Sequence, residues 1–99
     1  MTDIARAVPR SILYTPALSL NRVVKALSYD ADVHLMDLED SVPGPAKAEA
    51  RNICRTALEN APLSTNIAVR INALGTLDAV HDLVMLLSLI HISEPTRHS

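Results

Sequence analysis

The chain has 99 residues, about the length of one small domain, with 48% hydrophobic residues and a formal net charge of −2. Its acidic and basic residues are interspersed, which does not favour nucleic acid or an anionic membrane as a partner. A single cysteine excludes an internal disulfide, and no signal peptide is predicted at the amino terminus. The apolar stretch 83–92 is far shorter than the ~20 residues of a membrane span. We therefore expect a soluble, cytoplasmic globular protein.

Three short apolar segments have the composition of β-strands. The first spans residues 11–16 and stops at a proline, and the second spans residues 33–38 and stops at the acidic pair Glu39-Asp40. The third, residues 66–72, is rich in β-branched side chains and is followed by Gly75. Each segment is therefore predicted to be a buried strand that ends in a polar loop.

An amphipathic helix is predicted after each strand, because apolar residues there recur three and four positions apart. Ser19 and Thr76 are suitable caps for the first and third helices, and Pro45 suits the first turn of the second. The expected apolar stripes are Leu20, Val23, Val24 and Leu27 in the first helix, Ala50, Ile53, Cys54, Ala57 and Leu58 in the second, and Leu77, Val80, Leu83 and Val84 in the third.

The resulting order is strand, helix, strand, helix, strand, helix. The connections are too long for hairpins, which predicts parallel strands joined by crossover helices. Such a pattern fits part of a (β/α)₈ barrel and part of a doubly wound sheet, and periodicity alone does not separate the two.

In parallel α/β folds, reactive groups gather where the strands end. Glu39 and Asp40, beside Arg70 from the next strand, could orient metal-bound water or hold a cationic group while the guanidinium clamps a substrate carboxylate. The same spacing is also typical of a purely structural ion pair. The polar residues at these strand ends are Thr15, Asp37, Glu39, Asp40, Arg70 and Asn72.

The other candidate residues are predicted to be structural. His34 falls in a strand and His81 on a helix, and a lone histidine in either place is more often structural than catalytic. Cys54 lies on an apolar stripe, where it behaves as a small hydrophobic residue. Lys47 and Arg51 could reach the acidic pair or lie on the helix surface, and both are left out of the predicted site.

Five segments of the chain carry a family resemblance. They are RSILYTPA at 10–17, KAL at 25–27, DLEDSVP at 37–43, KAEAR at 47–51 and VRINALGT at 69–76. In order and spacing they resemble the start of the citrate lyase β-subunit and malyl-CoA lyase family, within the HpcH/HpaI aldolase superfamily. The resemblance implies that residues 1–86 are the first three βα units of a (β/α)₈ TIM barrel, which is incomplete.

The resemblance also implies an activity. Members of this family make or break a carbon–carbon bond between an acyl-CoA and a 2-oxo acid, with Mg²⁺ polarising the acid oxygen. Arg70 would bind the carboxylate of the oxo acid, and Glu39 and Asp40 would orient the waters of the metal without binding it directly. Arg22 and Lys25, on the first helix, would contact the phosphates of CoA, and the alternative interpretation is that they form a solvent-exposed helix face. The parent protein is expected to be a homo-oligomer or a subunit of a lyase complex.

The family pattern stops after the third predicted helix. Residues 87–97 read LSLIHISEPTR, which looks like the in-frame translation of a transposon-type sequencing adaptor. We therefore predict that native sequence ends near Leu86 and that residues 87–99 are a non-native tail, so that His91 and Glu94 are not metal ligands. The family's Mg²⁺ ligands come later than this point, so the chain alone is expected to bind no metal directly and to be inactive.

Two other functions remain open. The chain could be a non-catalytic βα module that binds an anion or a partner subunit through Arg70. It could also belong to an aldolase that acts on free 2-oxo acids without CoA, which would share the same arginine and metal chemistry.

Overall fold

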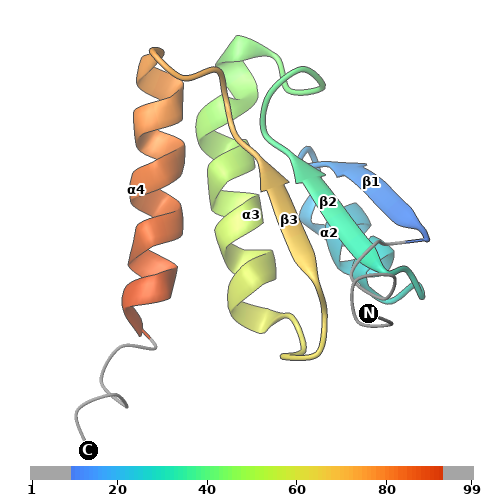
Figure 1. Ribbon diagram of the computed structural model, residues 1–99. Coiled ribbons are helices and arrows are strands. Elements are labelled where there is room, and N and C mark those ends of the chain that lie inside the picture. Colours follow the sequence, from blue (N-terminus) through green and yellow to red (C-terminus); the bar gives the residue numbers. More distant parts are fainter. Residues whose placement is uncertain (1–9, 93–99) are drawn as a thin grey trace, which may run out of the picture.

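The computed structural model describes residues 10–92, and these form the predicted alternation of strands and helices (Figure 1). The third strand ends at Arg70, so Ile71 and Asn72 belong to the following loop rather than to the strand. The elements are β1 (Ile12–Pro16), α2 (Leu20–Leu27), β2 (Val33–Asp37), the short 3₁₀ helix η1 (Gly44–Ala46), α3 (Lys47–Asn60), β3 (Ile67–Arg70) and α4 (Leu77–Ile92).

The three strands are parallel and lie in the order β1-β2-β3, which confirms the predicted parallel sheet. Helices α2 and α3 contribute side chains to a single core, so both cover the same face of the sheet. A doubly wound sheet reverses its strand order and places helices on both faces, whereas successive strands with helices on one face are the arrangement of a barrel. The topology therefore indicates part of a barrel rather than part of a doubly wound sheet, a distinction that periodicity alone could not make.

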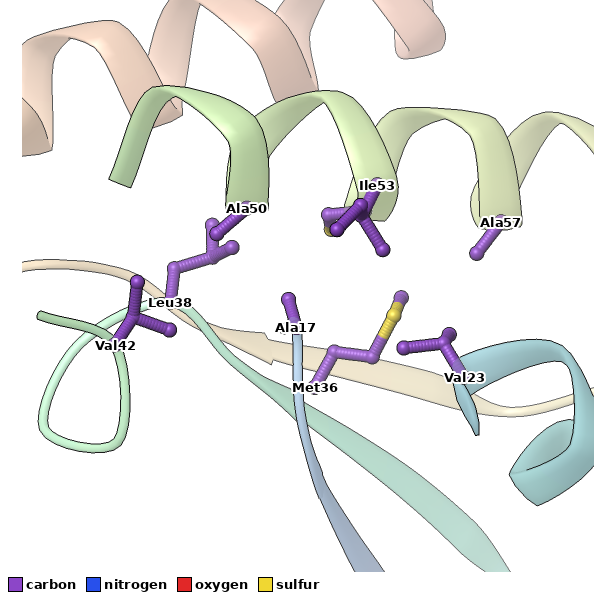
Figure 2. Close-up of a cluster of buried hydrophobic side chains, with 9 residues drawn as sticks. Ala17, Val23, Met36, Leu38, Val42, Ala50, Ile53 and Ala57 are labelled. Carbon is purple, nitrogen blue, oxygen red and sulfur yellow. The ribbon is translucent and has the colours of Figure 1, made fainter. Parts of the chain in front are cut away.

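The core lies between the sheet and helices α2 and α3 (Figure 2). Met36 points from β2 toward Val23 of α2 and Ala57 of α3, and all three are almost completely buried. Side chains alternate along a strand, so Met36 faces the helices while its neighbour Asp37 faces the opposite side of the sheet. Burial of a Met or Val side chain stabilises the fold by about 1.5–3 kcal/mol. The apolar stripe predicted for the second helix is confirmed, with Ile53 and Cys54 also in this core.

The opposite face of the sheet is open in the described part of the chain. Ile12 is 59% exposed and Tyr14 is 45% exposed, although both lie in a parallel strand. Leu35 and Ala68 occupy the same row as Tyr14 across the three strands. Parallel sheets are normally covered on both faces, so this open face has the character of a barrel interior.

The apolar stripe predicted for α2 is only half buried. Val23 is fully buried and Leu27 packs against the core, whereas Leu20 and Val24 are exposed. These two side chains line a groove of about 380 Å³ between α2 and α3.

The stripe predicted for α4 is wrong. Its four residues are exposed, and the helix instead buries Ala79 and Asp82. Most residues of α4 are apolar, so several of its faces carry an apolar stripe and the spacing does not identify the packed one. A buried ion pair from Asp82 to Arg51 of α3 fixes the rotation of the helix. The stripe left exposed consists of Leu77, Val80, Leu83 and Val84.

Helix α4 continues to Ile92, across the predicted end of native sequence at Leu86. Helix formation by an apolar segment does not depend on whether the sequence is native, so the boundary at Leu86 stays a prediction. Residues 93–99, including Glu94, lie outside the described residues. Within residues 10–92, none of the helices combines the length and apolar character needed to cross a membrane.

Candidate active site

Asp37, the last residue of β2, joins all three strands on the open face of the sheet. Its side chain is completely buried and lies in register with Arg70 of β3. Arg70 donates from Nε to Oδ1 at 2.7 Å and from Nη2 to Oδ2 at 2.8 Å, which is a bidentate pair. Tyr14 of β1 donates from Oη to Oδ2 at 2.5 Å. The carboxylate of Asp37 therefore fixes the arginine predicted to bind substrate.

The same carboxylate also shapes the turn that carries the two predicted acids. The backbone N–H of Glu39 donates to Oδ1 at 2.9 Å, and the backbone N–H of Ser41 donates to Oδ2 at 3.0 Å. The hydroxyl of Ser41 adds a third hydrogen bond of 2.6 Å to Oδ2. An aspartate that binds backbone N–H groups a few residues ahead folds the chain into a tight turn. Asp37 thus reverses the chain immediately after β2.

The pKa of Asp37 is held well below its usual range, chiefly by the hydrogen bonds from Arg70. Burial acts in the opposite direction, but Ser41, Tyr14 and the Glu39 N–H add further donors to the ionised form. The carboxylate is therefore negatively charged at any physiological pH.

Glu39 and Asp40 both approach the guanidinium of Arg70, which confirms that the acids and the arginine converge at one end of the sheet. Glu39 Oε1 lies 3.8 Å from Nε, and Asp40 Oδ2 lies 3.7 Å from Nη1. These are ion-pair distances rather than hydrogen bonds, and the Asp40 side chain is 75% exposed. Asp40 is therefore accessible to a ligand, and Glu39 is partly accessible, with its side chain 31% exposed.

The guanidinium of Arg70 has one edge occupied and one edge available. Its Nε and Nη2 atoms bind Asp37, and this hydrogen bonding raises the pKa of Arg70 further above its already high value. The ring of Tyr14 lies under the guanidinium at 5.9 Å from its centroid. The side chain is 39% exposed, and its Nη1 atom lies 3.7 Å from Oδ2 of Asp40. Its Nη2 atom also lies 3.5 Å from the Tyr14 hydroxyl. A substrate carboxylate would meet the end of the guanidinium, formed by Nη1 and Nη2, and not the side edge.

The cluster carries an excess of negative charge. Asp37, Glu39 and Asp40 supply three negative charges, against the positive charges of Arg70 and of Lys47, whose Nζ binds carbonyl oxygens of the same turn. Such a cluster favours an anionic ligand that arrives with a cation over a free anion. Within residues 10–89, His, Cys, Asp and Glu side chains do not gather in threes to hold a metal. The two free acids fit as groups that orient the waters of an ion held mainly by other ligands.

The loop after β3 is held by a second buried carboxylate. Asp82 of α4 is completely buried and accepts hydrogen bonds at Oδ2 from the backbone N–H of Asn72 at 2.8 Å and from its side-chain amide at 2.7 Å. Arg51 of α3 donates to Oδ1 of Asp82 at 3.2 Å and also contacts Asp78. This network anchors the chain two residues beyond Arg70. Sequence spacing gave no signal for Asp82, because it follows His81 on a helix whose residues are mostly apolar.

The two basic residues predicted to contact CoA lie away from this cluster. Arg22 and Lys25 are exposed on α2, Arg22 in its first turn and Lys25 in its last. Within residues 10–89, neither side chain forms an ion pair or hydrogen bond with the Asp37 cluster. The structure therefore brings together three of the five predicted site residues.

His34, His81 and Cys54, which are expected to be structural, form no hydrogen bond or ion pair with the Asp37 cluster within the described residues. His34 is buried on the helix-covered face of β2, opposite in direction to Asp37, and His81 is exposed on α4. Cys54 is completely buried, and burial raises its thiol pKa to about 12, with Asp82 adding to the effect. A thiol in this environment is protonated and unreactive.

The sequential parallel sheet, its one-sided helices and the polar cluster at the strand ends define the first three βα units of a (β/α)₈ barrel enzyme fold. A sequence profile for the family described as HpcH/HpaI aldolase/citrate lyase matches residues 10–91. The chain belongs to this family.

Several relatives support the assignment. The chain is 43% identical over 79 residues to a citrate lyase subunit beta-like protein of Mycobacterium tuberculosis, covering 79% of this chain and 27% of that protein. It is 38% identical over 68 residues to a (3S)-malyl-CoA thioesterase of Cereibacter sphaeroides, covering 68% of this chain and 24% of the relative. The chain thus spans about a quarter of the length of the curated relatives that it matches.

Solved structures agree with the fold. The crystal structure of protein CitE from M. tuberculosis in complex with magnesium, acetoacetate and coenzyme A matches with a TM-score of 0.68 and 41% identity, over 83% of this chain and 29% of that one. The citrate lyase beta subunit of the same organism, complexed with oxaloacetate and magnesium, matches with a TM-score of 0.67 and 41% identity, over 83% of this chain and 35% of that one.

Proposed function

We propose that the chain is the amino-terminal part of a magnesium-dependent CoA-ester lyase. The enzyme would act on a citryl-CoA or malyl-CoA type thioester and would release or use an acyl-CoA and a 2-oxo acid. The observation that carries the proposal is the guanidinium of Arg70, fixed by Asp37 and flanked by Glu39 and Asp40 at 3.8 and 3.7 Å. Relatives whose structures contain magnesium, oxaloacetate and coenzyme A support this chemistry.

Arg70 would bind the carboxylate of the 2-oxo acid through its free end. Asp37 and Tyr14 hold the guanidinium in one orientation, so little rotational freedom remains to be lost when the substrate binds. Lysine would supply the charge without the planar pair of donors.

Glu39 and Asp40 would serve as hydrogen-bond acceptors for water molecules around the ion and the oxo acid. When bound, magnesium supplies a Lewis acid that polarises the oxygen of the oxo or hydroxy acid. Arg22 and Lys25 would contact the phosphates of CoA along the first helix. The parent would be a homo-oligomer or a subunit of a lyase complex.

The test is an assay of the full-length protein, obtained by reading the gene past Leu86. We expect Mg²⁺-dependent cleavage of a malyl- or citryl-type thioester, and we expect Arg70→Lys to lower kcat/KM by about 10²–10³-fold, as for loss of a transition-state donor. Arg55, exposed on α3, provides a matched control, and Arg55→Lys should leave the kinetics unchanged. Full turnover in Arg70→Lys, or no cleavage by the wild type, would overturn the proposal.

A second candidate is hydrolysis of the thioester without carbon–carbon cleavage, because relatives at 37–38% identity are named (3S)-malyl-CoA thioesterases. Product analysis separates the two activities. A lyase yields an acyl-CoA and a 2-oxo acid, whereas a thioesterase yields free CoA and the intact hydroxy acid. Turnover of free oxo acids without CoA would instead indicate an aldolase.

We expect the 99-residue chain by itself to have no lyase activity. The outer edges of β1 and β3 have no partner strand among residues 10–92, and the sheet face that carries Arg70 is open to water. A cooperative thermal transition together with thioester turnover by this chain would contradict the expectation. Sequencing across Leu86 and Leu87 tests the predicted boundary of native sequence.

A further inference from the structure

Lys47, the first residue of α3, uses all of its hydrogen-bonding capacity on the backbone of the loop after β2. Its Nζ donates to the carbonyl oxygens of Leu38 at 3.2 Å, Glu39 at 3.0 Å and Val42 at 3.0 Å. An ammonium group has three donors and no acceptor, so these three bonds saturate it. Lys47 has no donor left for a ligand, and any functional effect must pass through the loop.

A lysine in this position is disfavoured by local rules. The amino end of a helix carries partial positive charge, which makes a cation in the first turn unfavourable. The preceding residue, Ala46, offers no side-chain cap that would compensate. A residue that breaks a local rule while making three tertiary bonds indicates a requirement of the site rather than of the helix.

The three carbonyls bracket the acidic turn. Leu38 precedes Glu39, and Val42 follows Asp40 by two residues and closes the turn by donating its N–H to the Glu39 carbonyl at 3.0 Å. Asp37 holds the N–H groups of this turn, and Lys47 holds its carbonyls. The turn is therefore fixed from both sides by opposite charges.

We infer that Lys47 is a positioning residue for the reaction: it holds the turn 39–42 so that the carboxylates of Glu39 and Asp40 stand beside Arg70. This inference rests on the proposed function and deepens it. Loss of the ammonium would let the turn shift, and a shift of about 1 Å in a catalytic group can lower a rate about 100-fold.

The kinetic test uses the full-length protein. We expect Lys47→Met to lower kcat about 10- to 100-fold with little change in KM for the thioester. Lys47→Arg, which keeps the charge and several donors, should recover part of the rate. Arg55→Met removes an exposed cation from the same helix and should change neither constant. A kcat for Lys47→Met within twofold of the wild type would overturn the inference.

A double-mutant cycle separates positioning from general destabilisation. If Lys47 acts through the acids, Lys47→Met should cost much less in a background that already carries Asp40→Asn or Glu39→Gln. A merely structural lysine would lower the rate by the same factor in every background. Multiplicative effects in both cycles would count against a positioning role.

Hydrogen exchange provides a readout that does not depend on lyase activity. In Lys47→Met, or in Lys47→Gln if the first variant folds poorly, amides 39–42 should exchange faster while those of the loop after β3 stay unchanged. Unchanged exchange at 39–42 would overturn the inference whatever the activity. If exchange at 39–42 is faster in the variant but the wild type has no lyase activity, the role of Lys47 in fixing the turn would be supported. Only the proposed function would then be refuted.

Discussion

The loops that follow β2 and β3 solve the same structural problem with opposite charges. Both leave the sheet at the end that carries the polar cluster, where the strand ladder stops and backbone groups lose their partners. In the first loop, the ammonium of Lys47 binds carbonyl oxygens, and in the second the carboxylate of Asp82 binds the N–H of Asn72. In each case the anchoring charge comes from the next helix. The functional side chains are thereby left free to face a ligand at the end of the sheet that carries the polar cluster.

The two anchors differ in burial and in partners. Asp82 is completely buried and forms an ion pair with Arg51, whose side chain is only 15% exposed. Lys47 is partly buried, and the partners found within the described residues are backbone carbonyls. Asp82 should therefore contribute mainly to the stability of the protein. Lys47 should contribute mainly to the geometry of the acids in the loop after β2. We expect substitutions in the two loops to show this contrast when stability is measured in the full-length protein.

The largest effect is expected for Asp82→Ala. The change leaves Arg51 and the Asn72 N–H without their buried acceptor, and breaking a buried pair on one side costs about 3–5 kcal/mol of unfolding free energy. Asp78→Ala is the matched control, because Asp78 contacts the same arginine but is 41% exposed, and its loss should cost no more than about 1 kcal/mol. Urea denaturation of both variants measures the difference. Equal costs would show that Asp82 is not the anchor.

The next largest effect is expected for Asp37→Asn, which weakens the hydrogen bonds that Asp37 accepts from Arg70 and from the loop after β2. Loss of charged hydrogen bonds should lower the unfolding free energy by about 1.5–3 kcal/mol at neutral pH. The folded pKa of Asp37 is depressed, so its contribution is present above the unfolded pKa of about 3.9 and is lost as pH falls below it. The difference between wild type and variant should therefore shrink between about pH 5 and the acid limit of folding. A constant difference across that range would contradict the assignment.

The glycines of the two loops give a smaller contrast. Gly75 has a φ of 93°, in the region that L-residues disfavour, so Gly75→Ala should cost about 1–2 kcal/mol. Gly44 has no positive φ, and an added methyl group there would meet no atom within 4 Å, so Gly44→Ala should be neutral or stabilising by about 0.4–1 kcal/mol. Thermal unfolding of the two variants is the measurement. A Gly75→Ala variant as stable as the wild type would mean that the loop after β3 can adopt a different backbone conformation at this position.

The smallest effect on stability is expected outside both loops, at α2. Arg22→Ala and Lys25→Ala change exposed side chains and should alter unfolding free energy by no more than about 0.5 kcal/mol. If these residues contact CoA phosphates, each change should raise KM for the thioester about two- to fivefold in the cleavage direction. KM for the oxo acid, measured in the condensation direction, should stay unchanged. Equal KM values in wild type and both variants would remove them from the site.

Much of the fold could be predicted from local pattern. The strand runs end within two residues of the observed ends, and Ser19 and Thr76 occupy the predicted helix caps. These features depend on spacing and on side-chain chemistry within a few residues. The rotation of α4 could not be predicted, because the contacts of Asp82 with Arg51 and Asn72, which belong to other elements, select among its apolar faces.

The candidate site shows the same division. Glu39, Asp40 and Arg70 could be identified because strand ends and motif resemblance mark them in the sequence. Lys47 could be identified only as a residue that could reach the acidic pair, and its role could not be predicted, because its partners are backbone carbonyls and carry no signature of residue type. Asp37 is marked in the sequence as a polar strand end and as the start of the segment 37–43, but its role depends on register with Arg70 across the sheet.

The sequence by itself determined the alternation of strands and helices, the family, and the acids and arginine at the strand ends, because periodicity and motif are properties of neighbouring residues. Only the tertiary structure decided that the helices cover one face, that Asp37 occupies one edge of Arg70, and that Lys47 and Asp82 anchor the two loops. These features join residues that are distant in the chain or bind backbone atoms, so they arise from packing and hydrogen-bond satisfaction, which spacing along the sequence does not encode.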